Sequence, residues 1–220
     1  MKIRVKFARK ERSKYIGHLD VMRSFQRGFI RAGVKMVYSE GFSPHQKMNF
    51  AQPLGVGVTS IGDYFDAEIE DGQDLKDIKE KLNAQMGEGF DVLDIRELMD
   101  GADKAMAAVR TASYRVKVND GKVPDPDIFL MRDEVLAVKK TKSGESEVNI
   151  RPWTKKLTLH DRTFEFTVNA GNENNLKPDL LMQTLYVLNG LDYDRDKLQI
   201  ERTELMAEGC IPLEDYQTIA

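Results

Sequence analysis

The stretch GHLDVMRSFQRGFIRAG, residues 17–33, decides the first part of the fold. Its apolar residues recur every three to four positions, which predicts an amphipathic helix with one buried face. Gly33 marks the expected C-terminal end of this helix. The stripe that should face the core consists of Leu19, Met22, Phe25 or Gln26, Phe29 and Ala32.

On both sides of this helix, polar and apolar residues alternate as they do in strands. Residues 2–8 place Ile3, Val5 and Phe7 on one face, which predicts a half-buried strand. After the helix we expect a short strand at residues 46–51 and a longer strand at 61–70. A second helix at 73–85 and a last strand at 89–98 follow. Together with the first strand, this order is β-α-β-β-α-β and indicates a ferredoxin-like unit.

The second half of the chain is expected to repeat this unit. Pro178 stands at the first position of an expected helix, where no backbone donor is lost. The first expected elements are a strand at residues 110–118 and a short helix at 125–132. Two hairpins follow, with 133–140 paired to 146–151 and 154–159 paired to 162–169. The helix at 178–188 and a last strand at 196–204 complete the unit. The sequence thus predicts an α+β protein of two ferredoxin-like halves packed together, residues 1–98 with a basic helix and a histidine loop, and residues 110–220 with a basic hairpin.

The composition is that of an ordinary globular protein, with 220 residues, 41% of them hydrophobic and 31% charged. The one cysteine, Cys210, excludes an internal disulfide framework and a cysteine-only iron–sulfur or zinc site. No apolar run approaches the roughly 20 residues of a membrane helix, and the first residues lack a signal-peptide core. We therefore expect a cytoplasmic protein with no membrane partner, and we assign it no cofactor.

The charge of the chain is strongly polarised. Residues 1–50 contain 12 Lys and Arg against 3 Asp and Glu, so their formal net charge is +9. The remaining residues contain 21 basic against 33 acidic side chains, a formal net charge of −12. A local basic field of this kind attracts phosphates or acidic partners, although the chain as a whole is slightly acidic.

Three arginines of the predicted helix, Arg23, Arg27 and Arg31, are four residues apart and therefore share one face. Like charges in such a row repel one another, so the row is favoured by something negative. The guanidinium fork suits the phosphates of a ligand. The alternative is a solvated face on which Asp20 pairs with Arg23.

Gly17, His18 and Asp20 stand at the expected start of the helix. Gly17 permits an unusual backbone conformation, and Asp20 is favoured there by the helix dipole. A charged His18 is disfavoured at this end, so we expect a neutral imidazole that can exchange a proton or make a hydrogen bond. A structural histidine that fixes the turn is the alternative.

The next loop, SEGFSPH at residues 39–45, combines hydroxyls, an aromatic ring and a histidine with glycine and proline. Its glycine allows a tight turn, and its phenylalanine can stack on a base or fill the core. The candidate binding residues here are Ser39, Gly41, Phe42, His45 and Lys47, of which His45 is also a candidate general acid–base. Residue types alone do not define a metal site, so we assign none.

A second basic stretch surrounds the expected hairpin turn in the second half. Its candidate binding residues are Lys140, Lys142 and Arg151, and Trp153 lies close to them in sequence. A basic hairpin with an aromatic residue can form a nucleic-acid surface. A charged edge strand that resists aggregation is the alternative.

Several motifs together resemble those of a known family. They are Gly17-His-Leu-Asp20, Arg27, Arg31-Ala-Gly33, Ser39-x-Gly-Phe-x-Pro-His45, Phe50, Pro53-Leu-Gly55, Lys140-x-Lys-Ser-Gly144, Pro178 and Arg202-Thr-Glu-Leu205. Through most of the chain this set resembles the radical SAM-linked protein family, a domain of unknown function. Its members are free-standing proteins or C-terminal extensions of B12-binding-type radical SAM enzymes, and the resemblance implies the free-standing form. It also implies a helper role, because the chain lacks the three-cysteine cluster motif of a radical SAM domain.

Three functions are compatible with these features. The leading one is a non-catalytic accessory module that binds RNA and presents it to a radical SAM enzyme. The second is a metal-independent RNA-cleaving enzyme that uses His18 or His45. The two ferredoxin-like halves expected here are similar to the architecture of CRISPR-type RNA-processing endoribonucleases. The third is a protein-binding subunit whose basic face docks an acidic enzyme. The sequence leaves open the RNA, the partner enzyme, the oligomeric state and whether the two histidines share one site.

Overall fold

The computed structural model describes residues 1–141, 144–172 and 174–219, except for the side chains of residues 140 and 141. It shows an α+β protein whose chain divides into two units. The first unit consists of Met1–Arg110 and Arg202–Ala220, and the second of Thr111–Glu201. The last part of the chain therefore belongs to the unit in which the chain begins.

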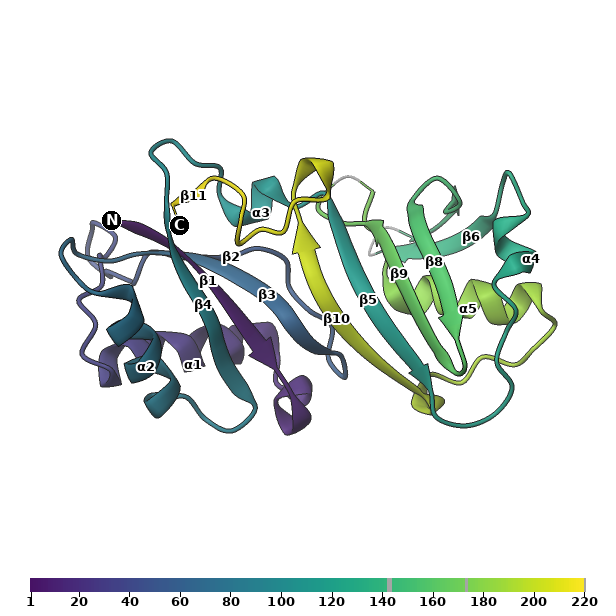
Figure 1. The fold of residues 1–220 in the computed structure, drawn as a ribbon, viewed down its shortest axis with the longest axis horizontal. Coiled ribbons are helices and arrows are strands. Elements are labelled where there is room, and N and C mark those ends of the chain that lie inside the picture. The colour runs from purple at the N-terminus through teal and green to yellow at the C-terminus, as the bar shows by residue number, and fades with distance from the viewer. Residues whose placement is uncertain (142–143, 173, 220) are drawn as a thin grey trace. The chain divides into compact units, whose positions relative to one another are not determined.

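The first unit is built on a sheet. Its strands are β1 (Lys2–Arg9), β2 (Met48–Phe50), β3 (Thr59–Glu68), β4 (Phe90–Leu98), β11 (Thr218–Ile219) and the end of β10 (Leu198–Met206). They lie in the order β11-β4-β1-β3-β10, and β2 pairs with β3 off this path (Figure 1). The central strand β1 is antiparallel to both neighbours, so that Val5 stands opposite Phe65 on one side and Ile95 on the other.

Two helices, α1 (His18–Arg31) and α2 (Leu75–Gln85), lie side by side in this unit (Figure 1). They cover one face of the sheet because β1 turns its apolar side chains Ile3, Val5 and Phe7 toward them. An aromatic cluster fills the core, and the ring centroids of Phe25 in α1 and Phe65 in β3 are 4.9 Å apart. This core fixes where α1 begins and which of its faces points outward.

The opposite face of the sheet is polar, since Lys2, Arg4 and Lys6 alternate with the apolar residues of β1. The segment 99–109, with α3 (Ala105–Ala108), and the chain after β10 bind to this face. Arg4 is 1% exposed and makes a two-pronged pair with Asp66, at 2.8 and 3.2 Å. It also donates to the backbone carbonyls of Leu213, Tyr216 and Asp103.

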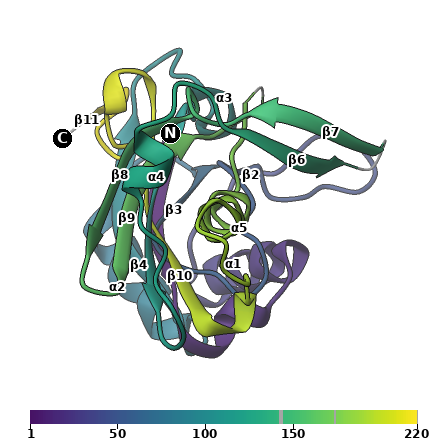
Figure 2. The ribbon, with the colours of Figure 1, turned by 90° about the vertical axis from the view of Figure 1, so that its right-hand side faces the viewer.

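The second unit contains a sheet and a separate hairpin. Its elements are β5 (Thr111–Val118), α4 (Asp127–Leu130), β6 (Leu136–Thr141), β7 (Gly144–Asn149), β8 (Thr154–His160), β9 (Thr163–Asn169), α5 (Pro178–Leu188) and the start of β10. The sheet order is β10-β5-β9-β8, and β6 and β7 form a separate two-stranded sheet. Figure 2 shows this hairpin apart from the sheet, and β6 contacts α5.

Short 3-10 turns connect these elements. They are η1 (Glu11–Tyr15), η2 (Arg195–Lys197) and η3 (Glu208–Cys210). The turn η1 comes directly before α1, so it helps to position the residues at the start of that helix.

The positions of the long strands and helices agree with the sequence prediction, including α1, α2, α5 and both hairpins of the second unit. The buried face of α1 differs in detail, because Val21 is buried while Leu19 is 60% exposed. The sequence did not indicate α3, β11 or the return of the chain end to the first unit. The division at residues 98 and 110 stays a prediction from sequence.

Candidate functional site

The arginine row lies on the outer surface of α1, opposite the buried Val21, Phe25 and Phe29. Arg23 is 60% exposed and pairs with Asp20 at 3.2 Å, as one explanation of the row required. Arg31 donates to the backbone carbonyl of Gln85 at the end of α2, at 2.6 Å. Arg27 has no ionic or hydrogen-bonded partner within the described residues. The row is therefore only partly neutralised by its own chain.

Not all of the positive charge in residues 1–50 is available to a ligand. Arg4 and Arg9 are buried, and Lys6, Lys10 and Lys47 are paired with carboxylates. Within the part of the chain that the structure describes, the basic side chains of this segment that are neither buried nor paired with a carboxylate are Lys2, Arg12, Lys14, Arg27, Arg31 and Lys35. The basic surface is real, but it is smaller than the formal net charge indicates.

His18 begins α1 directly after its N-cap residue Gly17. The imidazole packs edge-on against Phe50, with ring centroids 5.2 Å apart. Burial and then the positive Arg9 lower the pKa of His18, and Asp63 opposes them. The lowered pKa favours the neutral form of the imidazole at pH 7.

Gly17 does not have the unusual backbone that the sequence led us to expect. Its φ is −69° and its ψ is 157°, an extended conformation open to other residues. A Cβ atom built on it meets nothing within 4 Å. Asp20 stands in the first turn of α1, where the helix dipole favours a carboxylate.

A buried ionic cluster, which sequence reasoning missed, lies near His18. Asp63 accepts hydrogen bonds from Arg202 Nε at 2.9 Å and from Ser60 Oγ at 2.6 Å, and the two ionic side chains are almost fully buried. Arg9 Nε donates to the carbonyl of Ser13 in η1 at 2.9 Å, so it holds the turn that leads into α1. In the sequence these residues look like ordinary polar positions of strands, since partners 139 residues apart give no local signal.

The loop at residues 39–45 is closed by its two end residues. Ser39 Oγ lies 2.9 Å from His45 Nδ1 and accepts a hydrogen bond from the His45 backbone N–H at 3.1 Å. Ser39 N–H donates in turn to the His45 carbonyl, at 2.8 Å. Gly41 has a φ of +108°, which accounts for glycine at this turn. The Phe42 side chain is fully exposed at the tip, so it does not fill the core.

His18 and His45 lie near different parts of α1. His18 is the first residue of the helix, whereas Gln46, next to His45, donates to the carbonyl of Gln26 at 3.1 Å. Eight residues of helix separate these two points, or about 12 Å along the axis. No hydrogen bond or ring contact joins the two histidines among the residues described.

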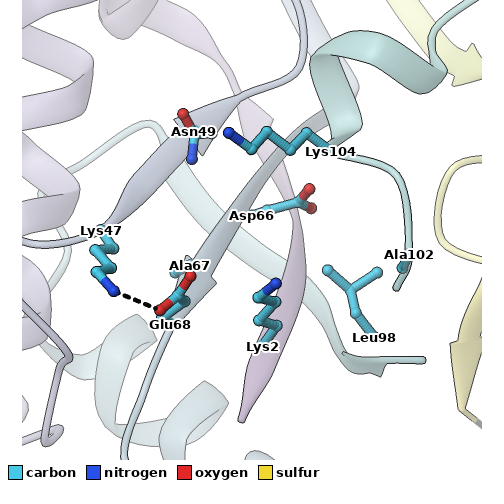
Figure 3. Close-up of a pocket in the computed structure, with 9 residues that line it drawn as sticks. All are labelled: Lys2, Lys47, Asn49, Asp66, Ala67, Glu68, Leu98, Ala102 and Lys104. Carbon is cyan, nitrogen blue, oxygen red and sulfur yellow. Dashed lines mark hydrogen bonds and ion pairs between the residues drawn. The ribbon is translucent and has the colours of Figure 1, made fainter. Parts of the chain in front are cut away.

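Lys47 lines a small pocket on the polar face of the first unit's sheet (Figure 3). About 50 Å³ of it is open to water-sized molecules. Lys47 Nζ pairs there with Glu68 at 3.2 Å. The residues that line it are Lys2, Lys47, Asn49, Asp66, Ala67, Glu68, Leu98, Ala102 and Lys104.

Two basic residues of the second unit, Lys139 and Arg151, make contacts within the fold of that unit. Arg151 Nε donates to the carbonyl of Arg132 at 3.1 Å, and its guanidinium lies 5.8 Å from the ring centroid of Phe129. Lys139 Nζ lies 5.4 Å from the centroid of the Trp153 ring. Lys142 and the side chain of Lys140 lie outside the described residues, so the predicted basic hairpin surface stays a prediction.

The first unit thus combines a basic helix face, a closed polar loop and a lysine-lined pocket within an α+β fold. The chain belongs to the family described as "Uncharacterized protein conserved in bacteria (DUF2344)", whose sequence pattern matches residues 2–178. No curated protein is similar enough to count as a match.

A chain of the "Crystal Structure of a Cbf5-Nop10-Gar1 Complex" aligns with a TM-score of 0.46 and 11% sequence identity. The alignment covers 92% of the present chain and 48% of the other chain, so the protein spans about half the length of that chain. None of the helices in the described ranges is long and apolar enough to cross a membrane.

Proposed function

We propose that the protein is an accessory subunit of a radical SAM enzyme system that binds RNA and presents it to the enzyme. The observation that carries the RNA part is the exposed arginine row of α1, in which Arg27 has no partner among the described residues. The bond between Gln46 and Gln26 holds the loop at 39–45 beside the same helix. The link to a radical SAM enzyme rests on the motif resemblance alone.

The proposed RNA surface joins two kinds of contact. Arg23, Arg27 and Arg31 would hold phosphates, since guanidinium groups pair with phosphate oxygens through two parallel hydrogen bonds. The exposed ring of Phe42 would stack on an unpaired base, a contact that does not depend on its identity. Ser39 and His45 would then hydrogen-bond sugar or base groups near the loop.

Substitution of Arg23, Arg27 and Arg31 by glutamine should weaken RNA binding and flatten its dependence on salt. Removing one arginine–phosphate pair should lower the slope of log K against log salt by about 0.7 for single-stranded RNA. The measurement is fluorescence anisotropy with total small RNA across a salt series. The matched control replaces Lys76, Lys79 and Lys81 of α2 by glutamine. This change removes the same amount of positive charge from the same unit. Equal affinity and slope in the arginine variant and wild type would refute the proposal.

An RNA-cleaving enzyme is the second candidate, favoured by the lowered pKa of His18. The separate contacts of His18 and His45 weigh against a shared acid–base pair. RNA cleavage to a cyclic phosphate that disappears in the His18→Ala, His45→Ala variant would establish this alternative. Co-purification with a radical SAM enzyme but without RNA would favour the protein-docking subunit instead.

We further infer that both units are variants of the ferredoxin-like fold. In the first unit, the order β4-β1-β3-β2 with α1 and α2 between strands supports this inference. In the second unit, the order β10-β5-β9-β8 supports it if β6 and β7 are an insertion after α4.

A further inference from the structure

The pocket around Lys47 lies on the sheet face that the helices leave uncovered. Strand side chains alternate between faces, so Lys2 of β1 and Asp66 of β3 point away from the core that Ile3 and Phe65 join. Lys104, which precedes α3, contributes the third lysine of the lining. Figure 3 shows the three lysines arranged around the part of β3 that carries Asp66. The site is therefore distinct from the outer surface of α1.

The carboxylates of this pocket are already neutralised by the protein. Asp66 receives both prongs of the Arg4 guanidinium, at 2.8 and 3.2 Å, and the backbone N–H of Ala105 at 2.6 Å. Glu68 is paired with Lys47 at 3.2 Å. Two ammonium groups remain, because Lys2 and Lys104 have no carboxylate partner within the described residues. The pocket thus offers two positive charges that its own chain does not balance.

We propose that this pocket binds the dianionic phosphate of a phosphomonoester. Such a group carries a charge of about −1.5 to −2 at pH 7, which matches the two unpaired ammonium groups. A phosphodiester of an RNA backbone carries one negative charge and would leave one lysine unbalanced. The pocket has room for a phosphate group, and the Asn49 side chain can donate a further hydrogen bond.

Two sources share this chemistry, a small phosphorylated molecule such as a nucleoside monophosphate and the 5′-phosphate end of an RNA. The inference does not depend on RNA binding by the arginine row, because its residues come from other elements. The two proposals can therefore fail separately.

The first test titrates the full chain with inorganic phosphate and with adenosine 5′-monophosphate by isothermal calorimetry. Wild type should show saturable binding, and the variant Lys2→Gln, Lys104→Gln should bind roughly a hundredfold more weakly, about tenfold for each ammonium group removed. The control variant Lys35→Gln, Lys76→Gln makes the same change of charge on exposed residues outside the pocket and should bind as wild type does. Absence of saturable binding by wild type, or equal binding by the pocket variant, would overturn the proposal.

The second test distinguishes the two sources with one oligoribonucleotide that ends in a 5′-phosphate or a 5′-hydroxyl. A preference for the phosphorylated form that the pocket variant loses identifies the RNA end as the ligand. Saturable monophosphate binding without that preference identifies a small molecule. An RNA affinity that depends on Arg23, Arg27 and Arg31 but not on the 5′ group, with no monophosphate binding, retains the RNA proposal and rejects the pocket.

Discussion

The arginines of this chain fall into two groups that differ in burial. Buried arginines stabilise the fold, and exposed arginines can contact a ligand. Arg4, Arg9 and Arg202 are 1%, 2% and 1% exposed, and each is saturated by carboxylates or backbone carbonyls. Arg27 and Arg31 lie on the surface with donors left for a ligand. A guanidinium in the first group stabilises the fold. In the second group Arg31 makes a single bond to the Gln85 carbonyl, so replacement of these exposed arginines should cost the fold less.

Replacement of Asp63 by alanine should cost about 3–5 kcal/mol of unfolding free energy, because it leaves the buried Arg202 without its carboxylate. Chemical denaturation followed by circular dichroism measures the effect. Asp77→Ala removes the partner of Lys81 from a pair that is about half exposed. That control should cost less than about 1 kcal/mol, as surface pairs do. Similar costs for both variants would show that the buried cluster is not a stability determinant.

At the scale of elements, the contact between β3 and β10 is unusually close at Gly62. A Cβ atom at this position would collide with the carbonyl oxygen of Thr203 and lie 2.7 Å from Glu204 Cα. Both are backbone atoms, so neither can move without shifting a strand. Glycine is required here for close approach and not for a positive φ.

Gly62→Ala should therefore destabilise the first unit by several kcal/mol, or prevent it from folding. Overpacking of this kind typically costs about 1–3 kcal/mol even where side chains can give way. The matched control is Gly17→Ala, where a Cβ atom meets nothing within 4 Å. Thermal unfolding of both variants gives the comparison. Equal melting temperatures for the two variants would contradict the close contact.

The elements themselves could be predicted from the sequence because their signals are local. Period-two alternation located β1, and the three-to-four spacing located α1. The buried partners of Arg4 and Asp63 could not be predicted, because an arginine on the polar face of a strand looks the same whether water or a distant carbonyl faces it. For the candidate site, the arginine row and the loop followed from spacing and residue type. The pocket did not, since Lys2, Lys47 and Lys104 come from three separate segments.

At the scale of the whole molecule, an ionic network ties the two ends of the chain together. Lys6 pairs with Glu204 and Glu214, each at 2.8 Å, and the Tyr64 hydroxyl donates to Glu204 at 2.5 Å. Burial lowers the pKa of Lys6, but the bonds to the two glutamates outweigh it and the net shift is upward. Burial and the charge of Glu204 raise the pKa of Tyr64 far above its ordinary value.

Stability should fall as the pH rises above about 10, where unfolded tyrosine and lysine lose their protons. Both groups keep their protons to a higher pH in the folded state than in the unfolded state. The unfolded state then binds fewer protons than the native state, so the free energy of unfolding decreases as the pH rises. Denaturation at a series of pH values between about 8 and 11 measures this. Tyr64→Phe should reduce the loss, while Tyr15→Phe, at an exposed ring, should not. An unchanged alkaline profile for Tyr64→Phe would contradict the upward shift.

The return of the chain end to the first unit has a consequence for the order in which the protein acquires its structure on the ribosome. The second unit, Thr111–Glu201, is one continuous segment and can fold as soon as it emerges. The first unit must wait, because Arg4 finds its acceptors at Leu213 and Tyr216, which are 209 and 212 residues further along. The unit whose synthesis begins first is therefore completed last, and until then the charged face of its sheet stays uncovered.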